Sequence, residues 1–330
     1  MNKTVAIIGS GSWGVALANH IAEMDNKVKI WSFSEDEKNM INNEKKCKFI
    51  PDMKINENVF CSTNIKEVVE DSDFIIHVTP SKFTRTTFDT YKDYVGKKPI
   101  IICSKGFEDE SLITLDKVIK EELPTARVAA LSGPSYATEV VDHIPTAVIL
   151  ASEDDEILET ISKDLSNEFM RIYKSKDIVG VEVGGSLKNI IAFCAGVCAE
   201  LNFGTNAQAA LITRGLAEIA RLGEKMGGKK ETFYGLSGLG DLILTCSSDE
   251  SRNRRAGRLI GKGLTVEEAK KEIGMTIESV ENIQIAKKLA EKYDVEMPIV
   301  NATYDVLYNG LEPKEAAKIL MTRALKFENK

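Results

Sequence analysis

The chain has 330 residues, about twice the length of an average domain, so we expect two domains. Hydrophobic residues make up 43% and charged residues 28%, which is ordinary for a folded globular protein and excludes a disordered or fibrous one. Lys and Arg number 43 against 50 Asp and Glu. The resulting net charge of -7 disfavours broad binding to nucleic acid or to an anionic membrane.

Cysteine, histidine and the N-terminus point to a cytoplasmic protein without a metal. The six cysteines form no Cys-x-x-Cys pair and no dense secreted-type framework, and the three histidines are too scattered for a metal cluster. No apolar segment of signal-peptide length precedes Val5. The apolar stretch from Ile190 to Ala199 has about half of the ~20 residues that a transmembrane helix needs, so we expect no stable membrane insertion.

Up to about residue 175, short apolar runs rich in β-branched residues alternate with segments of helical period. The strands we expect are Val5–Ile8, Val28–Trp31, Val59–Cys61, Phe74–Val78, Ile100–Cys103, Val128–Leu131, Ala147–Leu150 and Arg171–Tyr173. This alternation predicts a parallel sheet with crossover helices. Beyond it the chain has helical spacing broken by glycine clusters. We therefore predict an α/β protein with a doubly wound sheet in residues 1–178 and an all-helical domain in residues 179–330.

A glycine-rich loop follows the first expected strand and precedes a helix start. It reads Gly9-Ser10-Gly11-Ser12-Trp13-Gly14. In this context Gly9 makes the tight turn, Gly11 lets the backbone approach a pyrophosphate, and Gly14 allows close packing of helix and strand. The N–H groups at the helix start suit an anion. The N-terminal domain is therefore predicted to be Rossmann-like and to bind a dinucleotide.

The end of the second strand gives a mixed signal on the type of dinucleotide. An acid near Glu35 would bind the ribose hydroxyl of NAD, although Glu35 lies one or two residues late and is equally well explained as an exposed acid in the first turn of a helix. From Trp31 to Asp36 there is no cation for a 2′-phosphate. Phe33 has the chemistry to stack on adenine. We expect NADH to be at least tolerated.

Two further strand ends carry polar residues where ligands bind in open α/β sheets. Lys105 follows the strand at Ile100–Cys103 and is a candidate phosphate or cofactor contact. The strand at Val128–Leu131 runs into Ser132-Gly133-Pro134-Ser135, a turn before a helix start that suits an anion. The alternative for Ser135 is a plain helix N-cap.

Lys188 lies in a markedly apolar helical segment. Between Asp177 and Glu200 the other charged residue is Glu182. A lysine in such a stripe is costly unless it is paired or functional, and burial would lower its pKa towards a value useful for base chemistry. The alternative is a side chain that reaches out to the surface.

Two polar clusters follow in the helical domain. Asp241 comes after a glycine turn and has the composition of an N-cap. Ser251, Arg252 and Asn253 offer a hydroxyl, a guanidinium and an amide together at an expected helix start, which matches a phosphate monoester. Arg254, Arg255 and Arg258 are expected to lie on a solvated face.

Seven motifs match a known family in the same order. They are Gly9–Gly14, Ser104–Gly106, Leu131–Ser135, Leu187–Asn189, Gly238–Asp241, Ser251–Asn253 and Gly274–Glu278. Over essentially its full length the chain resembles the NAD(P)-dependent glycerol-3-phosphate dehydrogenases of the bacterial soluble type. The resemblance implies an oxidoreductase that transfers a hydride between NAD(P)H and dihydroxyacetone phosphate. The product would be sn-glycerol 3-phosphate for glycerophospholipid biosynthesis, with Lys188 as the proton donor and acceptor.

The resemblance also implies contacts to both ligands. For the cofactor these are, besides Gly9, Gly11 and Gly14 of the loop, Ser12, Trp13, Phe33, Lys105, Ala137, Arg252, Thr276 and Glu278. For the phosphate substrate they are Lys105, Gly133, Ser135, Lys188, Asp241, Ser251, Arg252 and Asn253. A homodimer is expected from the resemblance alone.

Two departures from the family pattern affect the cofactor site. Phe33-Ser34 stands where many members carry His and then Arg, which puts the usual contact to the NADP phosphate in doubt. Thr276 stands where Val is common.

The residues taken by themselves leave two other functions open. A β-hydroxyacid or ketopantoate-type reductase would take a carboxylate substrate, which an arginine also binds. A silent nicotinamide-sensing regulator is disfavoured by the net charge and by the absence of a spare segment for a DNA-binding or partner module.

Overall fold

The computed structural model describes residues 2–325 and 327–328. It divides into two compact units, Met1–Glu182 and Val183–Lys330. We call these unit 1 and unit 2. The division falls inside the long helix α8 (Ile178–Glu200), whose first turn packs in the core of unit 1 through Ile178 and Val181.

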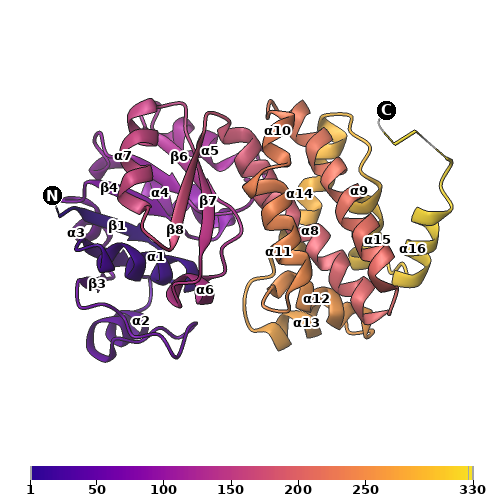
Figure 1. Ribbon diagram of the computed structural model, residues 1–330, viewed down its shortest axis with the longest axis horizontal. Helices are drawn as coiled ribbons and strands as arrows, with labels where there is room; N and C mark the ends of the chain where they lie inside the picture. The colour runs from indigo at the N-terminus through magenta and orange to yellow at the C-terminus, as the bar shows by residue number, and fades with distance from the viewer. Residues whose placement is uncertain (1, 326, 329–330) are drawn as a thin grey trace. The chain divides into compact units, whose positions relative to one another are not determined.

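Unit 1 is built on an eight-stranded sheet (Figure 1). Its strands are β1 (Thr4–Ile8), β2 (Lys27–Trp31), β3 (Val59–Ser62), β4 (Phe74–His77), β5 (Ile100–Ile102), β6 (Val128–Ser132), β7 (Thr146–Ala151) and β8 (Met170–Ser175). Their order in the sheet is β3-β2-β1-β4-β5-β6-β7-β8. All eight strands expected from the sequence are present. The runs of β5 and β6 are buried and almost wholly apolar, as strands covered on both faces should be. β2 alternates buried and more exposed residues, and the edge strand β8 is largely accessible.

One pairing differs from the expected parallel sheet. β7 runs antiparallel to β6, while the other neighbouring strands pair in parallel. The connection from β6 to β7, residues 133–145, holds one helix of five residues, α6 (Ala137–Val141). Such a helix is about 7.5 Å long, too short to carry the chain back along a strand of about 17 Å. The chain therefore enters β7 from the same edge at which it left β6.

Helices cover both faces of the sheet. Val5 and Ile7 of β1 point into one core with α1 (Ser12–Glu23), α6 and α7 (Asp155–Leu165). Ala6 and Ile8 point into the other core with α3 (Ile65–Val69), α4 (Thr84–Asp89) and α5 (Leu115–Glu122). A short helix, α2 (Glu35–Asn39), follows β2. This arrangement confirms the doubly wound fold.

Unit 2 is helical throughout its described residues, as expected. Besides α8 it contains α9 (Gly204–Lys225), α10 (Lys230–Phe233), α11 (Asp241–Ser247), α12 (Arg252–Gly261), α13 (Val266–Ile273), α14 (Glu278–Lys292), α15 (Pro298–Tyr308) and α16 (Pro313–Met321). A π-helical turn, Leu236–Gly240, leads directly into α11.

Two glycines let α8 and α12 touch backbone to backbone. A methyl group added at Gly196 would lie 1.9 Å from the Arg254 carbonyl oxygen, and one added at Gly257 would lie 1.9 Å from the Phe193 carbonyl oxygen. Side chains of any size would force the helices apart. This crossing fixes α8, which carries Lys188, against α12, which begins at Arg252.

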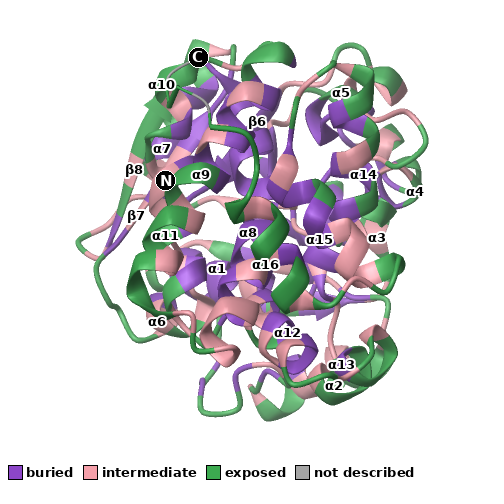
Figure 2. Cartoon of the chain, turned by 90° about the vertical axis from the view of Figure 1, so that its right-hand side faces the viewer, coloured by how far each residue is buried: buried purple, intermediate pink, exposed green. Residues whose placement is uncertain are grey.

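Among the described residues, α8 is long and apolar enough to span a membrane, but 89% of its most apolar stretch is buried inside the protein. The buried residues are purple in Figure 2. The apolar character of α8 is therefore that of a core helix.

Candidate active site

The glycine loop has the geometry that its sequence predicts. Gly9 adopts a φ of +126°, and its N–H donates to the Trp31 carbonyl at 3.1 Å. A methyl group at Gly14 would lie 2.2 Å from the Gly9 carbonyl oxygen, so the loop and α1 are in direct contact. Gly11 is different, because a methyl group there meets no atom within 4 Å. Its backbone is open beside the first turn of α1, whose N–H groups have no partner within the helix.

A small polar network stands behind this loop. The hydroxyls of Ser10 and Ser32 lie 2.8 Å apart, and both contact the carboxylate of Glu37, with 2.8 Å between the Ser32 oxygen and Glu37. Glu37 lies in the first turn of α2. The acid nearest to the glycine loop is thus Glu37, which the sequence analysis did not single out.

Glu35, the acid weighed from the sequence, is an exposed residue in the first turn of α2. Its carboxylate accepts the Thr63 hydroxyl at 2.6 Å and the Lys38 ammonium at 3.0 Å, and these bonds lower its pKa. The ring of Phe33 is 82% exposed. The surface after β2 therefore offers an aromatic ring and an ion pair.

Lys105 follows β5 in a loop tied to β4. The Cys103 N–H donates to the His77 carbonyl at 2.8 Å, and the Ser104 hydroxyl donates to the Thr79 carbonyl at 2.5 Å. Lys105 itself is half-buried. The lysine thus sits at the carboxyl edge of the sheet, where the sequence places it.

Ser135 is not an N-cap, which corrects one reading of the sequence. The N-cap of α6 is Tyr136, and the Ser135 hydroxyl instead donates to the Gly133 carbonyl at 3.1 Å. Ala137 is the first residue of α6 and packs, partly buried, against the core of unit 1. The turn is therefore ordered by its own serine before the helix begins.

Lys188 is buried and paired. Its side chain is 7% exposed, and its ammonium donates to the Asp241 carboxylate and to the Thr245 hydroxyl, each at 2.6 Å. The Asp241 side chain is 2% exposed. This geometry rules out the reading in which Lys188 reaches out to solvent. Asp241 is also not an N-cap, because it is the first residue of α11 and Gly240 precedes it as the cap.

A close backbone approach brings Lys188 and Asp241 together. A methyl group at Gly184 would lie 3.1 Å from the Ser237 carbonyl oxygen. Gly184 precedes Lys188 by four residues, and Ser237 precedes Asp241 by four. One helical turn beyond this contact, the lysine and the aspartate therefore meet.

The sequence analysis missed two residues of this site. Thr245 lies four residues after Asp241, and that spacing on α11 was the signal that could have identified it. Asn189 adjoins Lys188, is buried, and donates to the Glu278 carboxylate at 2.6 Å. Asn189 ends the Leu187–Asn189 motif, but the motif gave it no role, because its partner Glu278 lies on α14.

The starts of α12 and α14 share a polar cluster. Ser251 caps α12 by accepting the Arg254 N–H at 3.2 Å, and Asn253 accepts the Ser279 N–H through its side-chain oxygen at 2.8 Å. The Arg252 guanidinium lies 3.9 Å from the Glu278 carboxylate, a loose pair that is one-third exposed. Thr276 lies half-buried two residues before Glu278.

Arg254 corrects the expectation of a solvated arginine face. Its side chain is only 13% exposed and forms an ion pair with Asp249. Arg255 is exposed and Arg258 is partly exposed, as expected.

The possible metal ligands are the His, Cys, Asp and Glu side chains that the structure describes. Within residues 2–325 and 327–328, no group of three or more His, Cys, Asp or Glu side chains is placed to hold a metal ion. All six cysteines are free thiols.

Comparison with known proteins shows one family over the whole length of the chain. The family model described as NAD-dependent glycerol-3-phosphate dehydrogenase N-terminus matches residues 4–158, and the model for the C-terminus matches residues 177–318. The glycerol-3-phosphate dehydrogenase [NAD(P)+] of Agathobacter rectalis is 43% identical over 327 residues, covering 98% of this chain and 97% of the relative.

The corresponding protein of Bacillus subtilis is 43% identical over 326 residues, covering 97% of this chain and 94% of the relative. The crystal structure of a glycerol-3-phosphate dehydrogenase from Coxiella burnetii is similar to this structure with a TM-score of 0.95. It is 38% identical in sequence, and the match covers 98% of this chain and 99% of that one.

Proposed function

The chain belongs to the NAD-dependent glycerol-3-phosphate dehydrogenase family, and we propose how its residues divide the work. It is an NAD(P)-dependent oxidoreductase that reduces dihydroxyacetone phosphate to glycerol 3-phosphate. In the proposed division, residues 1–178 bind the dinucleotide, and residues 179–330 carry the proton chemistry and the clamp on the substrate.

Lys188 carries the proton in this proposal. The nicotinamide supplies or accepts the hydride when it is bound. As negative charge develops on the substrate oxygen, the Lys188 ammonium donates its proton to that oxygen, and in the reverse direction the neutral amine takes the proton back. Asp241 and Thr245 hold the ammonium in one orientation at 2.6 Å each. This buried, paired lysine is the observation that carries the proposal.

Arg252 binds the substrate phosphate, with Ser251 and Asn253 beside it. The Ser251 oxygen accepts the Arg254 N–H, and the Asn253 side-chain oxygen accepts the Ser279 N–H. Because these acceptors are satisfied by backbone groups, what the two side chains offer to a ligand is a hydroxyl proton and an amide N–H. Both are donors, which suits a phosphate and disfavours a cation.

The dinucleotide fits the residues of the glycine loop. The open backbone at Gly11 leaves the space that a pyrophosphate needs, and Gly9 and Gly14 shape the turn. Ser12 and Trp13 supply N–H groups of the first helical turn, and the exposed ring of Phe33 stacks on adenine. The other proposed cofactor contacts are Lys105, Ala137, Arg252, Thr276 and Glu278.

Three residues of unit 1 complete the proposed substrate contacts. Lys105 supplies a cation to the phosphate, and Gly133 and Ser135 line the ordered turn after β6.

The product then enters glycerophospholipid biosynthesis in the cytoplasm, and the proposed assembly is a homodimer. Sedimentation of the purified protein tests the assembly.

The experiment that tests the function follows the oxidation of NADH and of NADPH in separate spectrophotometric assays. Dihydroxyacetone phosphate is the substrate, and hydroxypyruvate and ketopantoate are offered in parallel and as competitors. We expect turnover with dihydroxyacetone phosphate and little with either carboxylate. Faster turnover of a carboxylate would replace this function with that of a hydroxyacid or ketopantoate-type reductase. Binding of the dinucleotide without turnover of any of these substrates would favour the alternative function, a catalytically silent nicotinamide-sensing regulator.

A further inference from the structure

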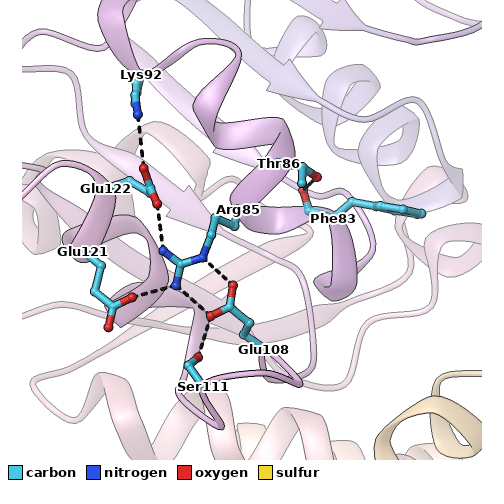
Figure 3. Close-up of polar contacts among 8 residues, drawn as sticks. All are labelled: Phe83, Arg85, Thr86, Lys92, Glu108, Ser111, Glu121 and Glu122. Carbon is cyan, nitrogen blue, oxygen red and sulfur yellow. Dashed lines mark hydrogen bonds and ion pairs between the residues drawn. The ribbon is translucent and has the colours of Figure 1, made fainter.

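Arg85 of α4 lies at the centre of a group of carboxylates (Figure 3). Its guanidinium donates to Glu108, to Glu121 at 2.6 Å and to Glu122 at 2.8 Å. Glu122 also accepts the Lys92 ammonium at 3.1 Å. Glu121 and Glu122 end α5, whereas Glu108 lies in the loop between β5 and α5. A single arginine thus joins α4, α5 and that loop.

The bond to Glu108 is a fork. The Nε of Arg85 lies 2.6 Å from one carboxylate oxygen and Nη2 lies 2.7 Å from the other. Two parallel bonds fix the orientation of both planar groups as well as their separation. Arg85 holds the pKa of Glu108 below its usual value, so the carboxylate stays ionised at neutral pH. The Ser111 hydroxyl donates to the same carboxylate at 2.5 Å, so this one group organises the loop.

Lys105 stands between two attachments of this loop. On one side the Ser104 hydroxyl is bonded to the Thr79 carbonyl. On the other side Phe107 is fully buried and Glu108 is held by Arg85. Thr79 and Arg85 both belong to the segment that follows β4. One short segment therefore restrains the chain on both sides of the lysine.

We propose that Arg85 is a positioning residue for Lys105, holding the loop at residues 104–112 in the conformation from which the lysine binds the substrate phosphate. The inference rests on the function of Lys105 proposed above. Without the guanidinium, the carboxylates of Glu108, Glu121 and Glu122 would repel one another, and the loop would lose the attachment three residues beyond Lys105. Because the Arg85 side chain is one-third exposed, its loss changes the global stability little.

Unit 1 contains a matched control for Arg85. Arg127 donates from Nε to Asp154 and from Nη2 to Glu156, each at 2.8 Å, and its side chain is 28% exposed against 32% for Arg85. It ties the segment before β6 to the start of α7, and these two carboxylates lie outside the loop at residues 104–112. Replacing Arg127 therefore removes a comparable ion-pair network without loosening Lys105.

The experiment measures steady-state kinetics with dihydroxyacetone phosphate at saturating cofactor for the wild type, Arg85→Gln, Lys105→Met, the double variant and Arg127→Gln. A misplacement of about 1 Å can cost up to ~100-fold, so we expect the loosened loop in Arg85→Gln to raise KM about tenfold. The value of kcat should change little, because the lost contact is equally present before and during the reaction. In the Lys105→Met background, Arg85→Gln should have no further effect on KM.

Two further variants and the Arg127→Gln control sharpen the result. Glu108→Gln keeps the side-chain length and should reproduce the effect of Arg85→Gln. Arg85→Lys should fail to restore KM, because an ammonium cannot form the fork. Arg127→Gln should leave KM at the wild-type value. Thermal melting of every variant reports whether the fold is intact.

Three results would overturn the inference while leaving the reaction established. The first is an unchanged KM in Arg85→Gln. The second is an equal rise of KM on Arg85→Gln in both backgrounds, which would mean that Arg85 does not act through Lys105. The third is an unchanged KM in Lys105→Met. Failure of the proposed function looks different, because the wild type itself would then not reduce dihydroxyacetone phosphate.

Discussion

The two units hold their site residues by opposite means. In unit 1 the glycine loop works through its backbone, with Gly9 in a turn of positive φ and Gly11 open to a ligand. In unit 2 the site is made of side chains, and its central pair, Lys188 and Asp241, joins residues 53 positions apart in the sequence. A backbone site depends on local sequence, whereas a buried ion pair depends on how helices pack.

The two kinds of site also differ in the free energy that it costs to build them. The N–H groups at a helix start are present in any helix and cost nothing extra to create. A buried ammonium must be compensated, and removal of one partner leaves the other charge unpaired in the core. Unit 2 should therefore be the more sensitive of the two to single substitutions at the site.

The largest effect is expected for Lys188→Met, which keeps the length of the side chain and removes its proton. The value of kcat should fall by ~10²–10⁴, while dinucleotide binding survives because Lys188 is not among the proposed cofactor contacts. Stopped-flow or steady-state rates, together with cofactor titration by fluorescence, measure both properties. Near-normal turnover would remove Lys188 from the reaction and with it the contrast between the units.

Glu218 gives unit 2 a pH-dependent stability. Burial raises its pKa to about 7, although its carboxylate accepts the N–H groups of Ile299 at 2.8 Å and of Val300 at 3.3 Å. Because the folded pKa lies above the ordinary value of 4.5, its contribution is complete below about pH 4.5 and is lost as the pH rises through about 7. The loss is on the order of 3 kcal/mol.

Urea denaturation between pH 5 and 8 measures this effect, and Glu218→Gln should flatten the profile. Glu182 in unit 1 is also buried with a raised pKa, through burial and its neighbour Asp116, so it contributes with the same sign. The difference between the profiles of the wild type and Glu218→Gln isolates the contribution of Glu218. An unchanged slope in the variant would contradict the assignment.

Arg252→Lys tests the phosphate clamp. A point charge loses the planar fork of the guanidinium, so kcat/KM for dihydroxyacetone phosphate should fall about 10- to 100-fold, the loss of one charge-assisted hydrogen bond. Arg255 lies exposed on the same helix and is the matched control. If Arg252→Lys retained the wild-type kcat/KM, the phosphate would bind elsewhere.

Two glycines of unit 1 separate ligand binding from folding. Gly11 has φ -67°, which any residue adopts, and open space around it, so Gly11→Ala should fold normally yet bind the dinucleotide about tenfold more weakly. Gly14→Ala should lower the melting temperature as well, because its methyl group would lie 2.2 Å from the Gly9 carbonyl oxygen. Unchanged affinity in Gly11→Ala would show that the pyrophosphate lies away from this backbone.

The smallest effect concerns the choice of cofactor. Lys38, the first cation after β2 in the sequence, is paired with Glu35 at 3.0 Å, and Glu37 contacts Ser10 of the glycine loop. We expect kcat/KM for NADH to equal or exceed that for NADPH. Measuring both values decides the matter, and a preference of more than tenfold for NADPH, ~1.4 kcal/mol, would require a cation supplied from elsewhere in the fold.

Local sequence determined the layers of unit 1. All eight strands were visible, the buried central ones as apolar runs and β2 and β8 as short runs with β-branched and aromatic residues. Gly9, Gly11 and Gly14 predicted the loop because turn and helix start are adjacent in the chain. The reversal of β7 was not visible, since strand direction depends on the length of α6, and helix length is poorly encoded in so short a segment. The alternative of Ser135 as an N-cap stayed open for the same reason, because the start of so short a helix is weakly encoded.

For unit 2 the sequence by itself identified the reactive groups, and the tertiary structure decided their partners. Lys188 and Asp241 each stand out from their surroundings, but only the approach of Gly184 to Ser237 brings them together. Asn189 and Thr245 were given no role from the sequence, because small polar residues acquire a function only through their neighbours. A charge in an apolar helix must be compensated, so the sequence alone predicts that Lys188 needs a partner. The identity of that partner depends on the packing of helices that lie far apart along the chain.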